Sequence, residues 1–153
     1  MAGLGDNDGA IRALGAAMGL PQLSLDADGQ CELLVDGDLS VLFVGEPKGD
    51  ALDLFARLGE PALAEGLALA LAEANFTGAS RGGGWLAVDP TTSDVVLRQR
   101  ITADRLDAVA VRGFAEAALH WRAALPSLHA PAAATPAAPS AGLADMEMTL
   151  LRL

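Results

Sequence analysis

The sequence predicts an α+β fold in the order helix, three-stranded antiparallel meander, helix, β-hairpin and long helix (αβββαββα), followed by a flexible Ala/Pro-rich C-terminal tail. Apolar residues recur at helical spacing in the segments before and after the meander. They alternate with a period of two in the strand segments. The connections between those strands are short and rich in Gly, Pro and Asp, and strands joined so directly run antiparallel.

The first helix is predicted over about Asp8 to Met18. Its apolar positions share one helical face and are Ile11, Leu14, Ala17 and Met18. Acidic residues at its N-terminus suit the helix dipole, and Gly19 and Pro21 end it.

The meander begins with a hairpin. Its apolar residues alternate with polar ones and are Cys31, Leu33, Val35, Leu39, Val41 and Phe43. Asp36-Gly37 between them is a tight-turn signal. A polar turn at residues 46–50 leads to the third strand, Ala51 to Leu58, whose apolar face consists of Leu52, Leu54, Ala56 and Leu58.

Pro61 opens the second helix, because the first helical position needs no N–H donor. The buried stripe of this helix is predicted to be Leu63, Leu67, Ala70, Leu71 and Ala74. Leu69 widens the apolar surface beyond that stripe. The helix is therefore predicted to pack on more than one side, with the sheet or another subunit as the second contact.

A second hairpin is predicted over Trp85 to Asp89 and Val95 to Ile101. Both faces of its first strand are apolar, so that strand is predicted to be buried on both sides. Thr102 is predicted to cap the long final helix, which runs to about Leu125. Gly113 lies in the middle of this helix, where close packing would explain it.

The composition limits the partners and the compartment. Twenty acidic against ten basic residues give a net charge of −10, which disfavours nucleic acid and anionic membranes. The excess charge suits a basic or polar protein partner, or simply keeps the protein soluble. The N-terminus has no signal-peptide pattern, and no apolar run is long enough for membrane insertion. A soluble, cytoplasmic protein is expected.

The sequence contains no familiar catalytic or metal-binding motif. The Gly82–Gly84 loop lacks the Lys-Ser/Thr pair of a phosphate-binding loop and is predicted to be a turn. Residues 26–29 (Asp-Ala-Asp-Gly) are likewise predicted to form a turn and not a calcium loop. Cys31 alternates with buried positions, and with only His120 and His129 the chain has no familiar zinc site. No enzyme activity, metal or cofactor is expected.

The C-terminal region differs in composition. Residues 1–125 form the predicted domain, 126–142 a flexible Ala/Pro linker and 143–153 a short apolar segment. In that last segment Leu143, Met146, Leu150 and Leu153 fit a helix face, whereas Met146, Met148 and Leu150 fit a strand. Both possibilities stay open.

Several short motifs occur in a characteristic order. They are Leu23-Ser24-Leu25-Asp26 with Gly29, then Ala74-Asn75-Phe76, then Leu86, Asp89 and Val95 to Leu97. With the element order, they resemble the class I type III secretion chaperones of the CesT/SycE-like (Tir chaperone) family. The resemblance covers about Asp8 to Leu125, and residues 126–153 extend past it.

The resemblance implies a bacterial homodimer that holds the N-terminal chaperone-binding segment of a secreted effector without ATP hydrolysis. The chaperone would keep that segment extended and deliver it to the secretion apparatus, with the secretion ATPase open as a second partner. The implied dimer interface includes Leu67, Leu71 and Trp85. The implied effector-binding residues are Ile11, Leu14, Met18, Leu23, Leu25, Leu33, Val35, Val41 and Phe43, with an effector strand adding to a sheet edge.

Two other functions remain as alternatives. One is a small-molecule-binding module or enzyme that uses the Gly82–Gly84 loop. The other is a regulatory adaptor that acts through its C-terminal tail.

Overall fold

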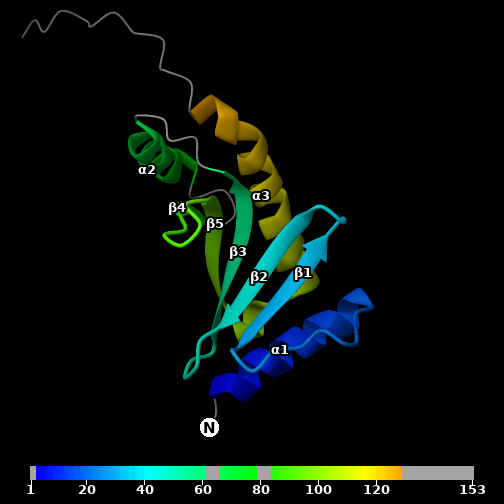
Figure 1. The fold of residues 1–153 in the computed structure, drawn as a ribbon. Coiled ribbons are helices and arrows are strands. Elements are labelled where there is room, and N and C mark those ends of the chain that lie inside the picture. The colour runs from blue at the N-terminus through cyan, green and yellow to red at the C-terminus, as the bar shows by residue number, and fades with distance from the viewer. Residues whose placement is uncertain (1–2, 61–65, 79–83, 129–153) are drawn as a thin grey trace, which may run out of the picture.

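The computed structural model describes residues 3–60, 66–78 and 84–128. Helix α1 (Gly3–Met18) precedes strands β1 (Gln30–Val35), β2 (Leu39–Gly45) and β3 (Ala51–Gly59). Helix α2 (Leu67–Gly78), strands β4 (Trp85–Val88) and β5 (Val95–Thr102), the short 3₁₀ helix η1 (Ala103–Arg105) and helix α3 (Ala108–Leu128) follow. The predicted α+β class and element order are confirmed (Figure 1).

The strands form one antiparallel sheet in the order β1-β2-β3-β5-β4. Its register aligns the buried residues of neighbouring strands, as in Leu33–Val41–Ala56–Leu97 across β1, β2, β3 and β5. The predicted period-two alternation in β1 to β3 is therefore confirmed, with the apolar set of each strand on the same face.

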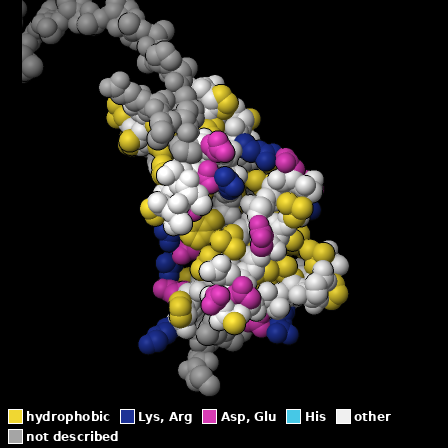
Figure 2. Space-filling view, in the orientation of Figure 1, with side chains coloured by type: hydrophobic (Ala, Val, Ile, Leu, Met, Phe, Trp, Pro, Cys, Tyr) yellow, Lys and Arg dark blue, Asp and Glu magenta, His cyan; other side chains and the backbone are white. Residues whose placement is uncertain are grey.

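Helices α1 and α3 pack on that apolar face. Ile11 and Leu14 of α1 and Val111 and Phe114 of α3 join the sheet residues in a single hydrophobic core. The opposite face of the sheet carries apolar side chains near its middle, with acidic and basic groups around them (Figure 2). Half-buried Leu42, Val44 and Phe55 belong to this second face.

Helix α1 begins at Gly3, one turn or more before the predicted start at Asp8. The additional N-terminal turn of the helix contains Asn7, a polar residue that is fully buried. Its Nδ2 donates to the carbonyl oxygens of Glu46, Gly49 and Ala51 at 3.2–3.3 Å. The helix is thereby tied to the β2–β3 turn.

Both Asp-Gly turns are confirmed. Asp36 and Gly37 have φ values of 51° and 73°, as a tight β1–β2 turn requires. In the other turn Asp26 Oδ1 accepts the N–H groups of Asp28 and Gln30 at 2.9 Å, and Gly29 has φ 75°. These bonds account for the Asp-Gly sequence without a metal.

The prediction that the Trp85 strand is buried on both faces is wrong for the single chain. Strand β4 is an edge strand, and of its four residues only Leu86 is buried. Trp85 and Val88 are 37% and 46% exposed. The sequence pattern shows that both faces of the strand are apolar, but it does not show which of them another element covers.

The predicted start of the last helix is also wrong. Thr102 belongs to β5 and makes no capping hydrogen bond, and η1 intervenes. The cap is Asp107, whose Oδ1 accepts the Ala110 N–H at 2.7 Å. The helix continues through Pro126 to Leu128, since a proline in the last turn removes one hydrogen bond only.

Gly113 is not closely packed, contrary to the prediction. A Cβ atom built there would meet nothing within 4 Å. The predicted helix start at Pro61, Leu63 of its stripe, and residues 129–153 of the linker and final segment lie outside the described residues.

Candidate functional site

The sheet has one open edge, on β1. The Gln30 N–H donates to Asp26 Oδ1 at 2.9 Å and the Gln30 carbonyl accepts from the Asp26 N–H at 2.8 Å, so Gln30 points away from β2. By the two-residue period of an antiparallel ladder, the N–H and C=O of Glu32 and Leu34 point the same way. They have no backbone partner among the described residues. These four groups can pair with an added strand.

The other edge, on β4, is closed by a side chain. The Asn75 Nδ2 of α2 donates to the Leu86 carbonyl at 3.0 Å, and the Leu86 N–H donates to Asn75 Oδ1 at 2.7 Å. The amide thus imitates one residue of a neighbouring strand. A partner strand would have to displace it, so β1 is the more accessible edge.

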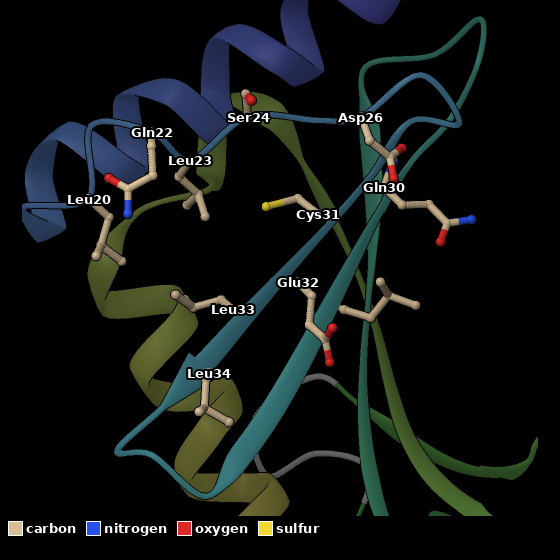
Figure 3. Close-up of a pocket in the computed structure, with 11 residues that line it drawn as sticks. Leu20, Gln22, Leu23, Ser24, Asp26, Gln30, Cys31, Glu32, Leu33 and Leu34 are labelled. Carbon is tan, nitrogen blue, oxygen red and sulfur yellow. The ribbon is translucent and has the colours of Figure 1, made fainter.

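A hollow of about 660 Å³ lies beside the open edge of β1, here called the β1 hollow (Figure 3). Leu20 and Leu23, in the loop after α1, line one side of it, and Cys31 and Leu33 of β1 line the other. Asp26 and Glu32 add carboxylates to the lining. The hollow can therefore take apolar side chains next to a strand paired with β1, with acidic groups nearby.

Two features of α1 hold the loop at residues 20–25 in place. At Gly15 a Cβ would lie 2.5 Å from the Leu20 carbonyl oxygen and 2.7 Å from the Leu23 Cβ, so only glycine permits this approach. Asp8 Oδ1 accepts the Leu25 N–H at 3.0 Å. That hydrogen bond, together with Arg12 at 2.7 Å, lowers the pKa of Asp8. Its carboxylate is the form that stabilises the loop.

Cys31 forms part of the wall of the β1 hollow. It is buried, and desolvation by that burial raises the pKa of its thiol. A raised pKa reduces the thiolate fraction, which is the reactive form. The structural role predicted for Cys31 fits this environment.

A second depression, of about 460 Å³, lies between the C-terminal end of α1 and the first half of α3 and is here called the α1–α3 groove. Met18 and Leu119, 38% and 37% exposed, line it together with Val35 of β1. Arg112, Glu116 and Asp36 supply its charges.

The nine residues predicted from the sequence to bind the effector do not form one surface in the structure. Ile11, Leu14, Val41 and Phe43 are at most 2% exposed and belong to the core, where they cannot contact a partner in this arrangement. Leu23 and Leu33 line the β1 hollow, and Met18 and Val35 line the α1–α3 groove. Leu25 is half-buried and packs on the core. Periodicity identified the apolar face of each element but not the residues left uncovered on it.

The three residues predicted to form the dimer interface differ in their exposure. Leu71 is 5% exposed and belongs to the core of the single chain, and Leu67 is half-buried. Trp85 is partly exposed and, with Phe55, contacts the Arg98 guanidinium at 5.4 Å. Sequence reasoning missed Phe76, which is 92% exposed, although its spacing of seven residues from Leu69 was a signal.

No metal-binding cluster occurs in the described part of the chain. No group of three or more His, Cys, Asp and Glu residues there could hold a metal ion. His120 packs edge-on against Trp121 with ring centroids 5.5 Å apart. No helix among the described residues is long and apolar enough to cross a membrane.

Comparisons with known proteins agree with this arrangement. The model of the Tir chaperone protein (CesT) family matches residues 9–122. No curated protein sequence matches the chain. In the crystal structure of the ExsC–ExsE complex, a similar chain has a TM-score of 0.64 and 25% identity, with 76% of this chain and 90% of that chain covered.

Two further structures are similar. The ExoT–SpcS complex from Pseudomonas aeruginosa gives a TM-score of 0.52 at 25% identity, covering 79% of this chain and 96% of that one. The HopA1–SchA chaperone–effector complex gives 0.62 at 18% identity, covering 78% and 92%, and shows the shared fold.

Proposed function

The chain belongs to the Tir chaperone protein (CesT) family, and from that premise we propose that it binds the N-terminal segment of a secreted effector along the open edge of β1. The protein is a class I type III secretion chaperone. Its proposed task is to keep the bound segment extended and competent for secretion by the bacterium in whose cytoplasm both are made. Binding, without catalysis, is the proposed activity.

The open edge of β1 beside the β1 hollow is the observation that carries this proposal. A strand paired with Glu32 and Leu34 gains main-chain hydrogen bonds that are independent of its sequence. Its alternate side chains would enter the hollow against Leu23 and Leu33. The carboxylates of Asp26 and Glu32 favour basic residues at the rim. One chaperone could thereby accept an extended segment without requiring it to fold.

Leu34→Pro tests strand addition without breaking the sheet. The Leu34 N–H points away from β2, so proline there removes a donor on the free edge and no ladder bond. The control is Leu34→Ala, which keeps the N–H and removes the same side chain, 60% exposed.

The measurement is fluorescence anisotropy with labelled N-terminal segments of the effectors secreted by the same bacterium. One lost hydrogen bond and a blocked approach should weaken binding about fivefold or more for Leu34→Pro relative to Leu34→Ala. Equal affinities of the two variants, at unchanged thermal stability, would show that the client does not pair with β1.

A homodimer through the outer surface of α2 and β4 is also proposed. Leu69 and Phe76, 65% and 92% exposed, lie beside the partly exposed Trp85 strand, since α2 packs on β4. Such a surface is costly to leave in water and favours a second copy. Leu67 stays at its margin, and Leu71 stabilises the helix beneath it.

Phe76→Glu tests the dimer. Phe76 makes little contact within the chain, so the variant should fold and run as a monomer in light scattering at micromolar concentration. Val109→Glu, the same kind of change at a residue of α3 that is 76% exposed, is the control and should leave the mass unchanged. A Phe76→Glu protein of the same mass as the parent places the interface elsewhere.

The alternative of a ligand site at Gly82–Gly84 has less support. Residues 82 and 83 lie outside the described part. At Gly84 a Cβ would meet the Arg98 carbonyl oxygen and the Leu97 side chain at 3.1 Å, so close packing on β5 explains that glycine.

A further inference from the structure

We propose that residues 143–153 form an amphipathic helix that docks in the α1–α3 groove of the same chain. Two observations support the docking: the lining of the groove and the residue pattern of the segment. Its regulatory consequence, given below, rests on the proposed function.

The α1–α3 groove has the form of a helix-binding site. Met18 and Leu119 expose more than a third of their surface on opposite walls, one on α1 and one on α3. Ala17, Ala108 and Ala115 between them are small enough for another backbone to approach closely. A helix laid there would bury the exposed apolar side chains against two helices at once.

The segment fits this groove better as a helix than as a strand on β1. Leu143, Met146, Leu150 and Leu153 form one helical stripe. The segment contains four Leu, two Met, one Ala and one Glu, which favour helix. It also carries Asp145 near its start and Arg152 near its end, as the helix dipole prefers. The β1 hollow, in contrast, contains carboxylates that would repel Asp145 and Glu147.

Charge complementarity supports the same docking. Arg112 lines the groove and has no ion-pair partner among the described residues. Glu147 borders the apolar stripe of the segment, one turn after Leu143. With the helix running antiparallel to α3, Glu147 comes within reach of Arg112.

The connecting chain is long enough for this return. From Leu128 back to Leu119 along α3 is roughly 14 Å at 1.5 Å per residue. Residues 129–142, rich in Pro and Ala, can span up to about 43 Å at 3.1 Å per residue. A linker of this length holds the segment at an effective concentration on the order of 1 mM near its own groove.

Docking would affect effector binding through Met18 and Val35. Both line the groove, outside the β1 hollow, and both are among the residues that the family resemblance assigns to the effector. A docked segment would withhold them until an effector displaces it. Without effector, the docked segment would cover apolar groove residues that would otherwise be exposed to water.

Amide hydrogen exchange on the full-length protein, without effector, tests the docking. With a dissociation constant on the order of 0.1 mM, the amides of residues 143–153 should exchange about tenfold slower than in an unstructured peptide. Leu119→Glu should abolish that protection. Val109→Glu, a change at an exposed apolar residue of α3 that does not line the groove, should preserve it. Exchange at unstructured rates in the parent, or protection that survives Leu119→Glu, overturns the proposal.

A charge exchange identifies the occupant of the groove. Arg112→Glu should reduce the protection of residues 143–153 severalfold, and Glu147→Arg in the same chain should restore it. Failure of the double variant to recover contradicts the assigned pairing. Protection that grows with protein concentration would place the segment on a second copy and refute docking within one chain. None of these results depends on effector binding.

Discussion

Replacing Asn75 with alanine should loosen β4 from α2. The Asn75 amide makes two hydrogen bonds with Leu86, at 3.0 and 2.7 Å, and they link the end of α2 to the middle of the edge strand. Alanine leaves the Leu86 N–H and carbonyl without these partners. The outer edge of β4 would then be open to water or to another strand.

The magnitude follows from the contacts. Two hydrogen bonds contribute about 1 kcal/mol each, and the better helix propensity of alanine returns about 0.5 kcal/mol. The free energy of unfolding should therefore fall by about 1.5 kcal/mol. For a domain of this size that corresponds to a decrease in Tm of roughly 4–6 °C.

Urea denaturation and amide exchange measure the effect. Thr77→Ala is the matched control, because the Thr77 hydroxyl bonds only to carbonyl oxygens of its own helix, at Glu73 and Ala74. It should change stability by less than about 0.5 kcal/mol. Faster exchange at Leu86 is expected in Asn75→Ala alone. If the two variants unfold at the same urea concentration, the amide does not anchor β4 and the reasoning is refuted.

Three other predictions follow from α1 and α3. Gly113→Ala should raise the free energy of unfolding by about 0.5–1 kcal/mol in urea denaturation, because a Cβ there meets nothing; a loss of stability would contradict the open site. Gly15→Ala should lower it by about 1–3 kcal/mol and weaken client binding, since the new Cβ collides with the Leu20 carbonyl at the β1 hollow; unchanged values of both would be inconsistent with that contact. The Leu25 N–H is the largest cause of the lowered pKa of Asp8, and Arg12 is the second. The ionised Asp8 carboxylate therefore stabilises the fold fully above the unfolded pKa of about 3.9, and this stabilisation is lost as the pH falls through the lower folded pKa. Thermal unfolding should therefore show Asp8→Asn less stable than the parent at pH 6, with the difference shrinking as the pH falls below about 3.9. A difference independent of pH would exclude this role.

Local sequence signals located most of the elements. Period-two alternation found β1, β2 and β3 because each has one face in the core, and Asp36-Gly37 defined the turn between the first two. The motif Ala74-Asn75-Phe76 marked the end of α2 through the family resemblance. The structure assigns its residues three different tasks: Ala74 is buried, Asn75 holds β4, and Phe76 is exposed.

The errors occurred where local signals compete. Thr102 is a good cap residue, but its pairing with Ala51 keeps it in β5, and Asp107 caps α3 instead. The two apolar faces of β4 suggested a strand buried on both faces, although only Leu86 of its four residues is buried. In both places contacts distant in the sequence decided between two locally acceptable structures.

The sequence by itself determined the order of helices and strands and the apolar face of β1, β2 and β3, because these depend on short-range periodicity and turn chemistry. The family followed from the resemblance of its short motifs and their order. It could not separate Ile11 and Phe43, which fill the core, from Met18, which remains exposed. Only the tertiary structure decided that, since burial depends on which elements cover each face. It also left β1 open and closed β4 with Asn75, through hydrogen bonds between segments that the sequence places apart.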